Sequence, residues 1–238
     1  DEMSSRGLGD VYKRQGINLA RNRQRTIMRI MKLTKHLIWT LLCALAACGP
    51  QQVPVNDVEN LPVPSAADSA FAHVYDPLNG LWQGDFEIYQ NDNDEPRDNN
   101  ILYNPTTAII TRANVNSVRV VNVKQRYESV TPYFQKVEII DRYFDGSKAV
   151  STGVNKVQDG KMWCVVNKPE ETVIHHGRME GPHTIVWQRS EQDPLRVEYF
   201  RETVEGDRYT ILGWGYYEGD DTTRMPRYWY YGQYRRDY

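Results

Sequence analysis

Cysteine is scarce in this sequence, and its scarcity excludes a fold stabilised by disulfides. The 238 residues contain three cysteines. Cys43 and Cys48 fall at the end of an N-terminal apolar run, so the remainder of the chain keeps only Cys164, which has no intramolecular partner. Cys164 stands in the apolar sequence MWCVV, which predicts a buried strand residue. A catalytic thiol is the alternative, although no pattern of bases surrounds it.

A strong excess of charge is also missing. The net charge is −2 and 40% of the residues are hydrophobic, which excludes a polytopic membrane protein and a disordered charged tail and predicts one domain or two small ones. Residues 1–47 hold 9 Lys and Arg against 3 Asp and Glu, so residues 48–238 hold 20 against 28, a net charge of −8. Because nonspecific nucleic-acid binding depends on Lys and Arg, we predict no nucleic-acid partner.

Catalytic and cofactor fingerprints are absent as well. The sequence has no G-x-S-x-G, P-loop, H-E-x-x-H or dinucleotide glycine motif, so we predict no enzymatic activity and no cofactor. His175 and His176 are adjacent in an expected strand and therefore point to opposite faces. One of them together with His183 could bind zinc or haem iron, but no third ligand stands at a suitable spacing, and no metal is predicted.

The first 27 residues are interpreted as foreign to the protein. Residues 10–15, DVYKRQ, are the translation of GATGTGTATAAGAGACAG, a transposon adapter used to prepare sequencing libraries. We interpret residues 1–15 as adapter and residues 16–27 as translated upstream sequence, which makes Met28 or Met31 the predicted start.

A secretory signal follows. Lys32 and Lys35 precede an apolar run over residues 37–47 and then the sequence LAACG. The run has eleven residues, whereas a membrane-spanning helix needs about 20. Residues 45–48 resemble the bacterial lipobox, with a coincidental cysteine after an ordinary signal peptide as the alternative. The resemblance implies a signal peptide over residues 28–47, cleavage before Cys48 and acylation of that cysteine, for example with palmitate.

The same resemblance implies a location. Gly49 in place of Asp after the cysteine implies anchoring in the outer membrane of a Gram-negative bacterium, and two or three acyl chains hold a protein there stably, whereas one does not. Residues 48–70 carry four prolines among polar residues and are predicted to be the lipidated cysteine and a flexible tether. The folded domain is expected over residues 71–238, with residues 91–100 forming a polar loop that is either a solvent-facing linker or a mobile flap.

Turn signals then recur at short intervals and indicate an all-β domain. Runs rich in Val, Ile, Thr, Tyr and Trp lie between them, and no run has a helical apolar period. Short turns join sequential antiparallel strands, and closure of such a meander removes its exposed edges. We predict a single antiparallel up-and-down β-barrel of about ten strands, with a β-sandwich as the alternative. The strands expected after residue 170 cover residues 172–176, 184–188, 195–204 and 209–217.

The opening of this domain resembles that of lipocalins and related calycins. Gly80, Trp82 and Gly84 form G-x-W-x-G after the turn-forming sequence DPLN. The resemblance implies that the Trp82 ring plugs one end of the barrel and that an arginine of the last strand, Arg235 or Arg236, lies over it. A domain of about ten strands without a disulfide is more similar to fatty-acid-binding or nitrobindin-like barrels than to the eight-stranded lipocalins.

Aromatic residues crowd the C-terminal third, with eight Tyr and Trp within residues 214–234. Alternation sends about half to each face. One face is then expected to fill the barrel while the other packs against the tether; a Tyr- and Trp-lined pocket is the alternative. Charged Glu198, Arg201 and Glu202 share one expected strand and are assigned to a solvated outer face, with entry of one charge into the barrel as the alternative.

We predict that this monomeric, membrane-anchored protein reversibly binds a small apolar or amphipathic ligand inside the barrel. The residues expected to contact the ligand, with the arginine as polar anchor, are Trp163, Trp187, Tyr199, Arg201, Trp214 and Tyr230. The alternative is an interaction or structural module of the cell envelope, whose filled barrel contacts protein or glycan through exposed aromatic residues. An empty interior of roughly 300 Å³ or more favours the ligand, and a filled interior favours the module.

Overall fold

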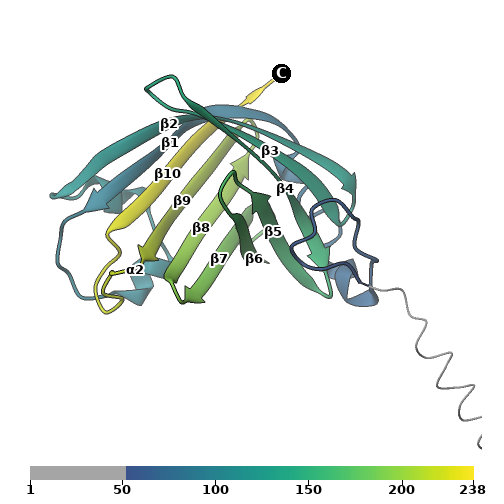
Figure 1. The fold of residues 1–238 in the computed structure, drawn as a ribbon, viewed down its shortest axis with the longest axis horizontal. Coiled ribbons are helices and arrows are strands. Elements are labelled where there is room, and N and C mark those ends of the chain that lie inside the picture. Colours follow the sequence, from purple (N-terminus) through teal and green to yellow (C-terminus); the bar gives the residue numbers. More distant parts are fainter. Residues whose placement is uncertain (1–51) are drawn as a thin grey trace, which may run out of the picture. The chain divides into compact units, whose positions relative to one another are not determined.

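A computed structural model describes residues 52–238, so the adapter sequence, the signal peptide and Cys48 lie outside the described residues. Ten strands form a closed barrel in which each strand pairs antiparallel with the next, and β10 pairs with β1 (Figure 1). This confirms the predicted single up-and-down barrel and excludes the sandwich. The strands are β1 (Gly80–Asn91), β2 (Val115–Thr131), β3 (Phe134–Arg142), β4 (Lys148–Gln158), β5 (Lys161–Asn167), β6 (Thr172–Met179), β7 (Thr184–Gln192), β8 (Leu195–Glu205), β9 (Arg208–Tyr217) and β10 (Tyr228–Asp237).

Short helices accompany the barrel at its ends. They are η1 (Ala66–Phe71), η2 (Asp76–Leu78), α2 (Asn99–Tyr103) and η3 (Thr107–Thr111). We call the end of the barrel that holds η2 and the C-terminus the closed end, and the opposite end, with the loops after β3, β5 and β9, the open end. Among residues 52–238, no helix has the length and apolar character that a membrane span requires.

Trp82 plugs the closed end. Its indole is fully buried, donates a hydrogen bond from Nε1 to the Leu78 carbonyl at 2.6 Å, and meets the Tyr209 ring edge-on at 5.5 Å between ring centroids. The Arg236 guanidinium lies 4.2 Å from the centroid of the Trp82 ring. Of the two arginines expected to cover this ring, Arg236 therefore does so, while Arg235 is exposed.

Close contacts and backbone conformation explain why glycine stands on both sides of Trp82. A Cβ atom at Gly84 would lie 1.8 Å from the carbonyl oxygen of Gln233 in β10, so only glycine lets the two strands approach. Gly80 has a φ of 117°, a conformation that other residues rarely adopt. The G-x-W-x-G motif thus closes the barrel between its first and last strands.

The outward aromatic residues of β8, β9 and β10 are covered by the segment between β1 and β2. Leu102 of α2 and Ile109 of η3 are buried against Tyr199, Trp214 and Trp229. The Trp214 indole donates to the Leu102 carbonyl at 2.7 Å. The expectation that the tether covers these rings is therefore wrong. Because apolar Ile and Leu residues follow the polar stretch over 91–100, the segment returns to the barrel wall after it.

Residues 52–70, expected to be a flexible tether, instead pack against β4 and the hairpin that follows it. The Lys156 ammonium donates to the carbonyls of Pro54 and Asp57 at 3.2 and 2.7 Å. Asp68, fully buried, accepts a hydrogen bond from the Gly160 amide at 2.7 Å. These two backbone carbonyls are the hydrogen-bond acceptors of the Lys156 ammonium group. The described unit accordingly begins well before residue 71.

Candidate functional site

The interior of the barrel holds a cavity of about 170 Å³ between the Trp82 plug and the open end. This volume is below the roughly 300 Å³ at which common ligand pockets begin, but the interior is not filled either. The cavity therefore suits only a small molecule. Its walls are mostly apolar and are formed by Phe86, Gln125, Tyr127, Val137, Ile139, Asn155, Cys164, Val166, Lys168, Val173, His175, Trp187, Phe200, Glu202 and Ile211.

Glu202 is the carboxyl group at the base of this cavity. It stands on β8 opposite Ile185 of β7 and Ile211 of β9. Burial raises the pKa of Glu202 to about 7, and hydrogen bonding with Trp187 and Tyr209 opposes this rise. A carboxyl group with such a pKa gains and loses its proton near neutral pH. Ionisable groups with strongly shifted pKa values are common at functional sites.

Cys164 also faces the cavity, and its thiol is not activated. Burial, together with the charge of Glu202, raises the pKa of the thiol well above its ordinary value, while Lys168 opposes the rise. A thiol that stays protonated is a poor nucleophile. The geometry therefore favours the strand-residue interpretation of Cys164 over the catalytic one, although its side chain borders a cavity and is only partly buried.

A buried ionic cluster lies on the open-end side of the cavity. Glu198 accepts a hydrogen bond from the Tyr217 hydroxyl at 2.9 Å, and its carboxylate lies 3.4 Å from His175 Nε2 and 3.8 Å from Arg189 Nη1. The Tyr217 hydroxyl is also hydrogen-bonded to the Tyr230 hydroxyl. Burial favours the neutral acid, but the contacts with His175, Tyr217 and Arg189 outweigh it and lower the pKa of Glu198. These contacts favour the ionised form of the Glu198 carboxyl group inside the barrel.

Lys168 connects the interior to the rim of the open end. It lines both the interior cavity and a rim cavity of about 520 Å³ that contains Asp141, Tyr143, Glu171 and Arg196. Arg196 Nη1 donates to Glu171 at 2.5 Å. Burial raises the pKa of Asp141, and Lys168 opposes this. The rim is thus charged, and Lys168 borders both the rim cavity and the interior cavity.

The structure brings only two of the predicted ligand contacts into the interior. Trp187 lines the cavity, and Tyr230 belongs to the Glu198 cluster and stacks with Phe86 at 5.7 Å between ring centroids. Tyr199 and Trp214 instead stack on each other, at 5.5 Å between centroids, under the segment that contains α2. As wall residues they cannot touch an interior ligand, and their assignment to the ligand site is corrected.

Trp163 and Arg201 are also on the outer face. Trp163 packs edge-on against His176 at 5.3 Å between ring centroids, and Arg201 Nε donates to Glu180 at 2.5 Å. The physical reason is strand alternation: inward Cys164 and Glu202 are their immediate chain neighbours. Arg201 therefore cannot be the polar anchor that was predicted for a ligand in the interior.

Glu198 and Glu202 are the residues that the sequence interpretation misplaced. They were assigned to a solvated outer face, but both point inward, and the alternative of a charge inside the barrel is the one realised. The signal that could have identified them is their spacing. Positions four apart in a strand share one face, and Phe200 between them lies on that face as well.

The adjacent His175 and His176 lie on opposite faces of β6, as strand alternation predicts. His175 lines the cavity, His176 contacts Trp163 on the outer face, and His183 lies in the loop between β6 and β7. Within the described part of the chain, no three His, Cys, Asp or Glu side chains are placed to hold a metal ion.

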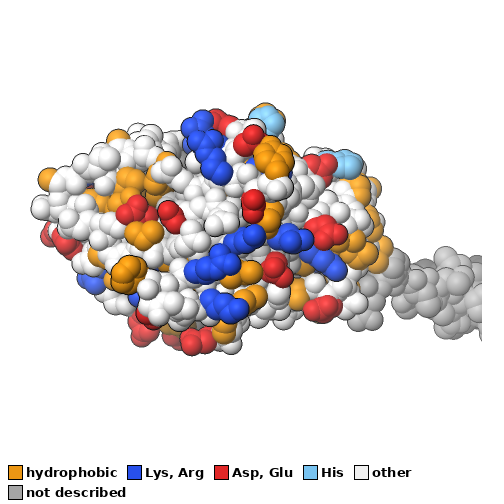
Figure 2. Space-filling model, turned by 90° about the horizontal axis from the view of Figure 1, so that it is seen from above, with side chains coloured by type: hydrophobic (Ala, Val, Ile, Leu, Met, Phe, Trp, Pro, Cys, Tyr) orange, Lys and Arg blue, Asp and Glu red, His pale blue; other side chains and the backbone are white. Residues whose placement is uncertain are grey.

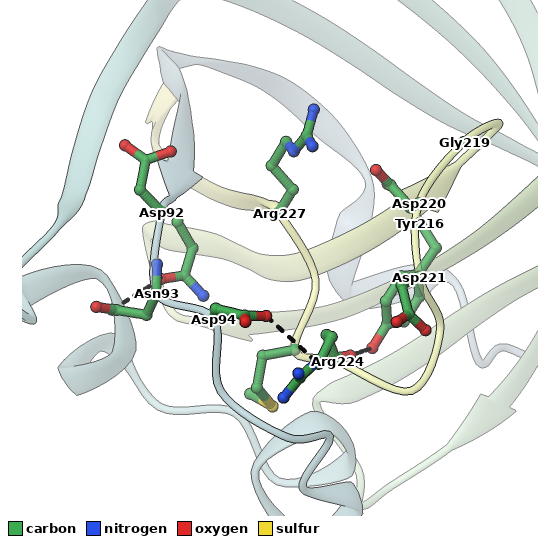
Figure 3. A pocket seen from close by; sticks show the side chains of 11 residues that line it. Asp92, Asn93, Asp94, Tyr216, Gly219, Asp220, Asp221, Arg224 and Arg227 are labelled. Atoms are coloured by element: carbon green, nitrogen blue, oxygen red, sulfur yellow. Dashed lines mark hydrogen bonds and ion pairs between the residues drawn. The ribbon is translucent and has the colours of Figure 1, made fainter.

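A third cavity, of about 350 Å³, lies between the residues that follow β1 and the loop from β9 to β10 (Figure 3). Its carboxylates already have partners within the same loops. Asp94 lies 3.2 Å from Arg224 Nε, Asp221 accepts from the Thr223 amide at 2.9 Å, and Asp220 accepts from the Tyr217 amide at 2.8 Å. The cavity is larger than the interior one, but turn formation accounts for its polar groups. The interior cavity remains the candidate site.

No protein-family model and no curated protein matches the chain. Solved structures that match include Rv2717c from M. tuberculosis, with 14% identity, coverage of 74% of this chain and 100% of that one, and a TM-score of 0.44. A redesigned β-barrel matches with 10% identity, coverage of 70% and 97%, and a TM-score of 0.34. A de novo designed fluorescence-activating β-barrel matches with 10% identity, coverage of 69% and 98%, and a TM-score of 0.32. Identities and scores this low support no conclusion about function.

Proposed function

We propose that this protein is a lipid-anchored lipoprotein of the bacterial outer membrane that binds a small amphipathic ligand inside its barrel, without chemical turnover. The observation that carries the binding function is the interior cavity, whose apolar walls surround a buried carboxyl group at its base. Burying an ionisable group and leaving space beside it both cost stability. Sites that keep such costly features are commonly functional.

The distribution of aromatic residues favours this function over the envelope module. The module requires exposed Tyr and Trp, but among residues 52–238 only Tyr103 and Tyr238 are exposed. On the face shown in Figure 2, basic side chains form a band with acidic side chains beside it, and the apolar side chains are scattered. The Tyr and Trp residues of this part of the chain are therefore used mainly in packing, and Phe144 is the one further exposed aromatic side chain among residues 52–238.

The anchor is supported by the lipobox-like sequence that ends at Cys48. Replacing the acceptor thiol removes the acyl chains, and with them the apolar surface that holds a protein at a membrane, about 0.8 kcal/mol per buried CH₂. We expect the Cys48→Ser variant to move from the membrane fraction to the soluble envelope fraction and to lose the mass of the acyl groups. Cys43→Ser, in the expected signal peptide, is the matched control. Membrane retention of the acyl-free Cys48→Ser protein would contradict the proposal.

Binding is tested by native mass spectrometry of the full chain, extracted gently from its own membrane. We expect a small molecule to accompany the protein. The Val166→Phe variant adds volume at a cavity wall and is expected to abolish this mass, whereas Val120→Phe, at an exposed position on β2, should leave it unchanged. An apo mass for the unsubstituted chain, together with no response of Trp187 fluorescence to small lipophilic probes, would refute the binding function.

A further inference from the structure

Glu202 has no counterion in the described part of the chain. A buried carboxylate ordinarily gains basic partners, as Glu198 does from His175 and Arg189. None of the ion pairs among residues 52–238 involves Glu202. Lys168 lines the same cavity, but it acts on Asp141 and Cys164. The base of the cavity therefore presents an acidic group that faces space instead of a cation.

A second hydrogen-bond acceptor stands beside the same cavity. Asn155 is 2% exposed and lines the cavity from β4. Its Nδ2 donates to Gln135 Oε1 at 2.9 Å, which directs the amide, but its Oδ1 has no partner among the described residues. An unpaired buried acceptor costs free energy, and a donor supplied by a ligand would recover it. The aromatic rings of Trp187 and Phe200 in the same wall also favour a cation.

We propose that the ligand of this cavity is a small amine. Its ammonium group would pair with the Glu202 carboxylate and donate to Asn155 Oδ1, while its apolar body would fill the space between Val166, Val173 and Ile211. This inference rests on the proposed binding function and names the chemical class of the ligand. Charge-assisted hydrogen bonds to a desolvated carboxylate are stronger than neutral ones, so they would distinguish an amine from an alcohol of equal size.

The pairing implies a defined dependence on pH. Only the ionised Glu202 attracts an ammonium group, and its pKa of about 7 places that change near neutrality. Amine affinity should therefore rise as the pH is raised through about 7. The phenols and thiol that face Glu202 have raised pKa values and stay neutral there; they are Tyr127, Cys164, Tyr209 and Tyr234. Lys168 and His175 are the basic groups that line the cavity, and His183 lines a small pocket that Glu202 also borders.

Benzylamine, benzyl alcohol and benzoate are suitable probes because they share one ring and differ in the polar group. Calorimetric titration of the full chain should show binding of benzylamine, weaker binding of benzyl alcohol and none of benzoate. The Glu202→Gln variant should weaken benzylamine binding about tenfold or more and leave benzyl alcohol unchanged. Glu205→Gln, on the same strand with a 64% exposed side chain, is the control and should change neither.

The outcomes separate the two proposals. If none of the probes binds the unsubstituted chain, and no molecule accompanies it, the binding function itself fails. If benzyl alcohol or benzoate binds as well as benzylamine, or if Glu202→Gln leaves benzylamine binding intact, the cavity binds ligands but the amine assignment is wrong. Should Glu202→Gln fail to fold, the pH series on the unsubstituted chain decides, because benzylamine affinity that falls with rising pH overturns the assignment.

Discussion

The Trp82→Ala substitution is expected to lower the free energy of unfolding by about 3–5 kcal/mol. The indole is fully buried at the closed end, where it contacts Tyr209 and Arg236 and donates to the Leu78 carbonyl. Alanine would leave a cavity at the junction of the first and last strands and an unpaired carbonyl in η2. Urea unfolding followed by circular dichroism measures the loss.

The two terminal arginines supply matched controls for this prediction. Arg236→Ala removes the guanidinium over the ring and its hydrogen bonds to the Asn79 and Pro77 carbonyls, and should cost about 0.5–2 kcal/mol. Arg235→Ala, at the exposed neighbouring position, should change stability by less than about 0.5 kcal/mol. Equal effects of Trp82→Ala and Arg235→Ala would show that the closed end does not depend on the plug.

The fold could be predicted because its determinants are local. Hairpin turns such as Asp159-Gly160, with φ values of 55° and 68°, recur through the sequence and reverse the chain at each strand end. The G-x-W-x-G opening identified the closing contact, with only the choice between Arg235 and Arg236 left to the structure. Alternation likewise placed His175 and His176 on opposite faces.

The site could not be predicted to the same extent, because the face of a strand that enters the barrel depends on distant contacts. Apolar residues occur on both faces of β8 and β9, since the segment that contains α2 buries Tyr199 and Trp214 from outside. Aromatic character therefore carried no information about the interior. The inward carboxyl groups of Glu198 and Glu202 appeared as ordinary surface charges, because only the three-dimensional wall shows which side of the strand is covered.

Replacement of Glu198 is the second substitution that we expect to cause a large loss in the free energy of unfolding. The Glu198 side chain is 13% exposed and faces Arg189, whose side chain is 7% exposed. Removing one member of a buried ion pair typically costs about 3–5 kcal/mol, because the other charge stays buried. Here Arg189 keeps Glu191 at 2.9 Å and Glu171 at 3.6 Å, so the lower end of that range applies.

Glu198→Gln should therefore reduce the free energy of unfolding by about 3 kcal/mol at neutral pH, with the difference from the unsubstituted chain shrinking in acid. The pKa of Glu198 is lower in the folded chain than its ordinary value of 4.5, so its contribution is complete above that value and is lost as the pH falls through the folded pKa. Urea unfolding from about pH 7 to about pH 3 tests this. Glu191→Gln, which removes the exposed partner of the same arginine, should cost less than about 1 kcal/mol. If the difference in unfolding free energy between Glu198→Gln and the unsubstituted chain stays constant down to the lowest pH, the carboxylate charge does not stabilise the open end of the barrel.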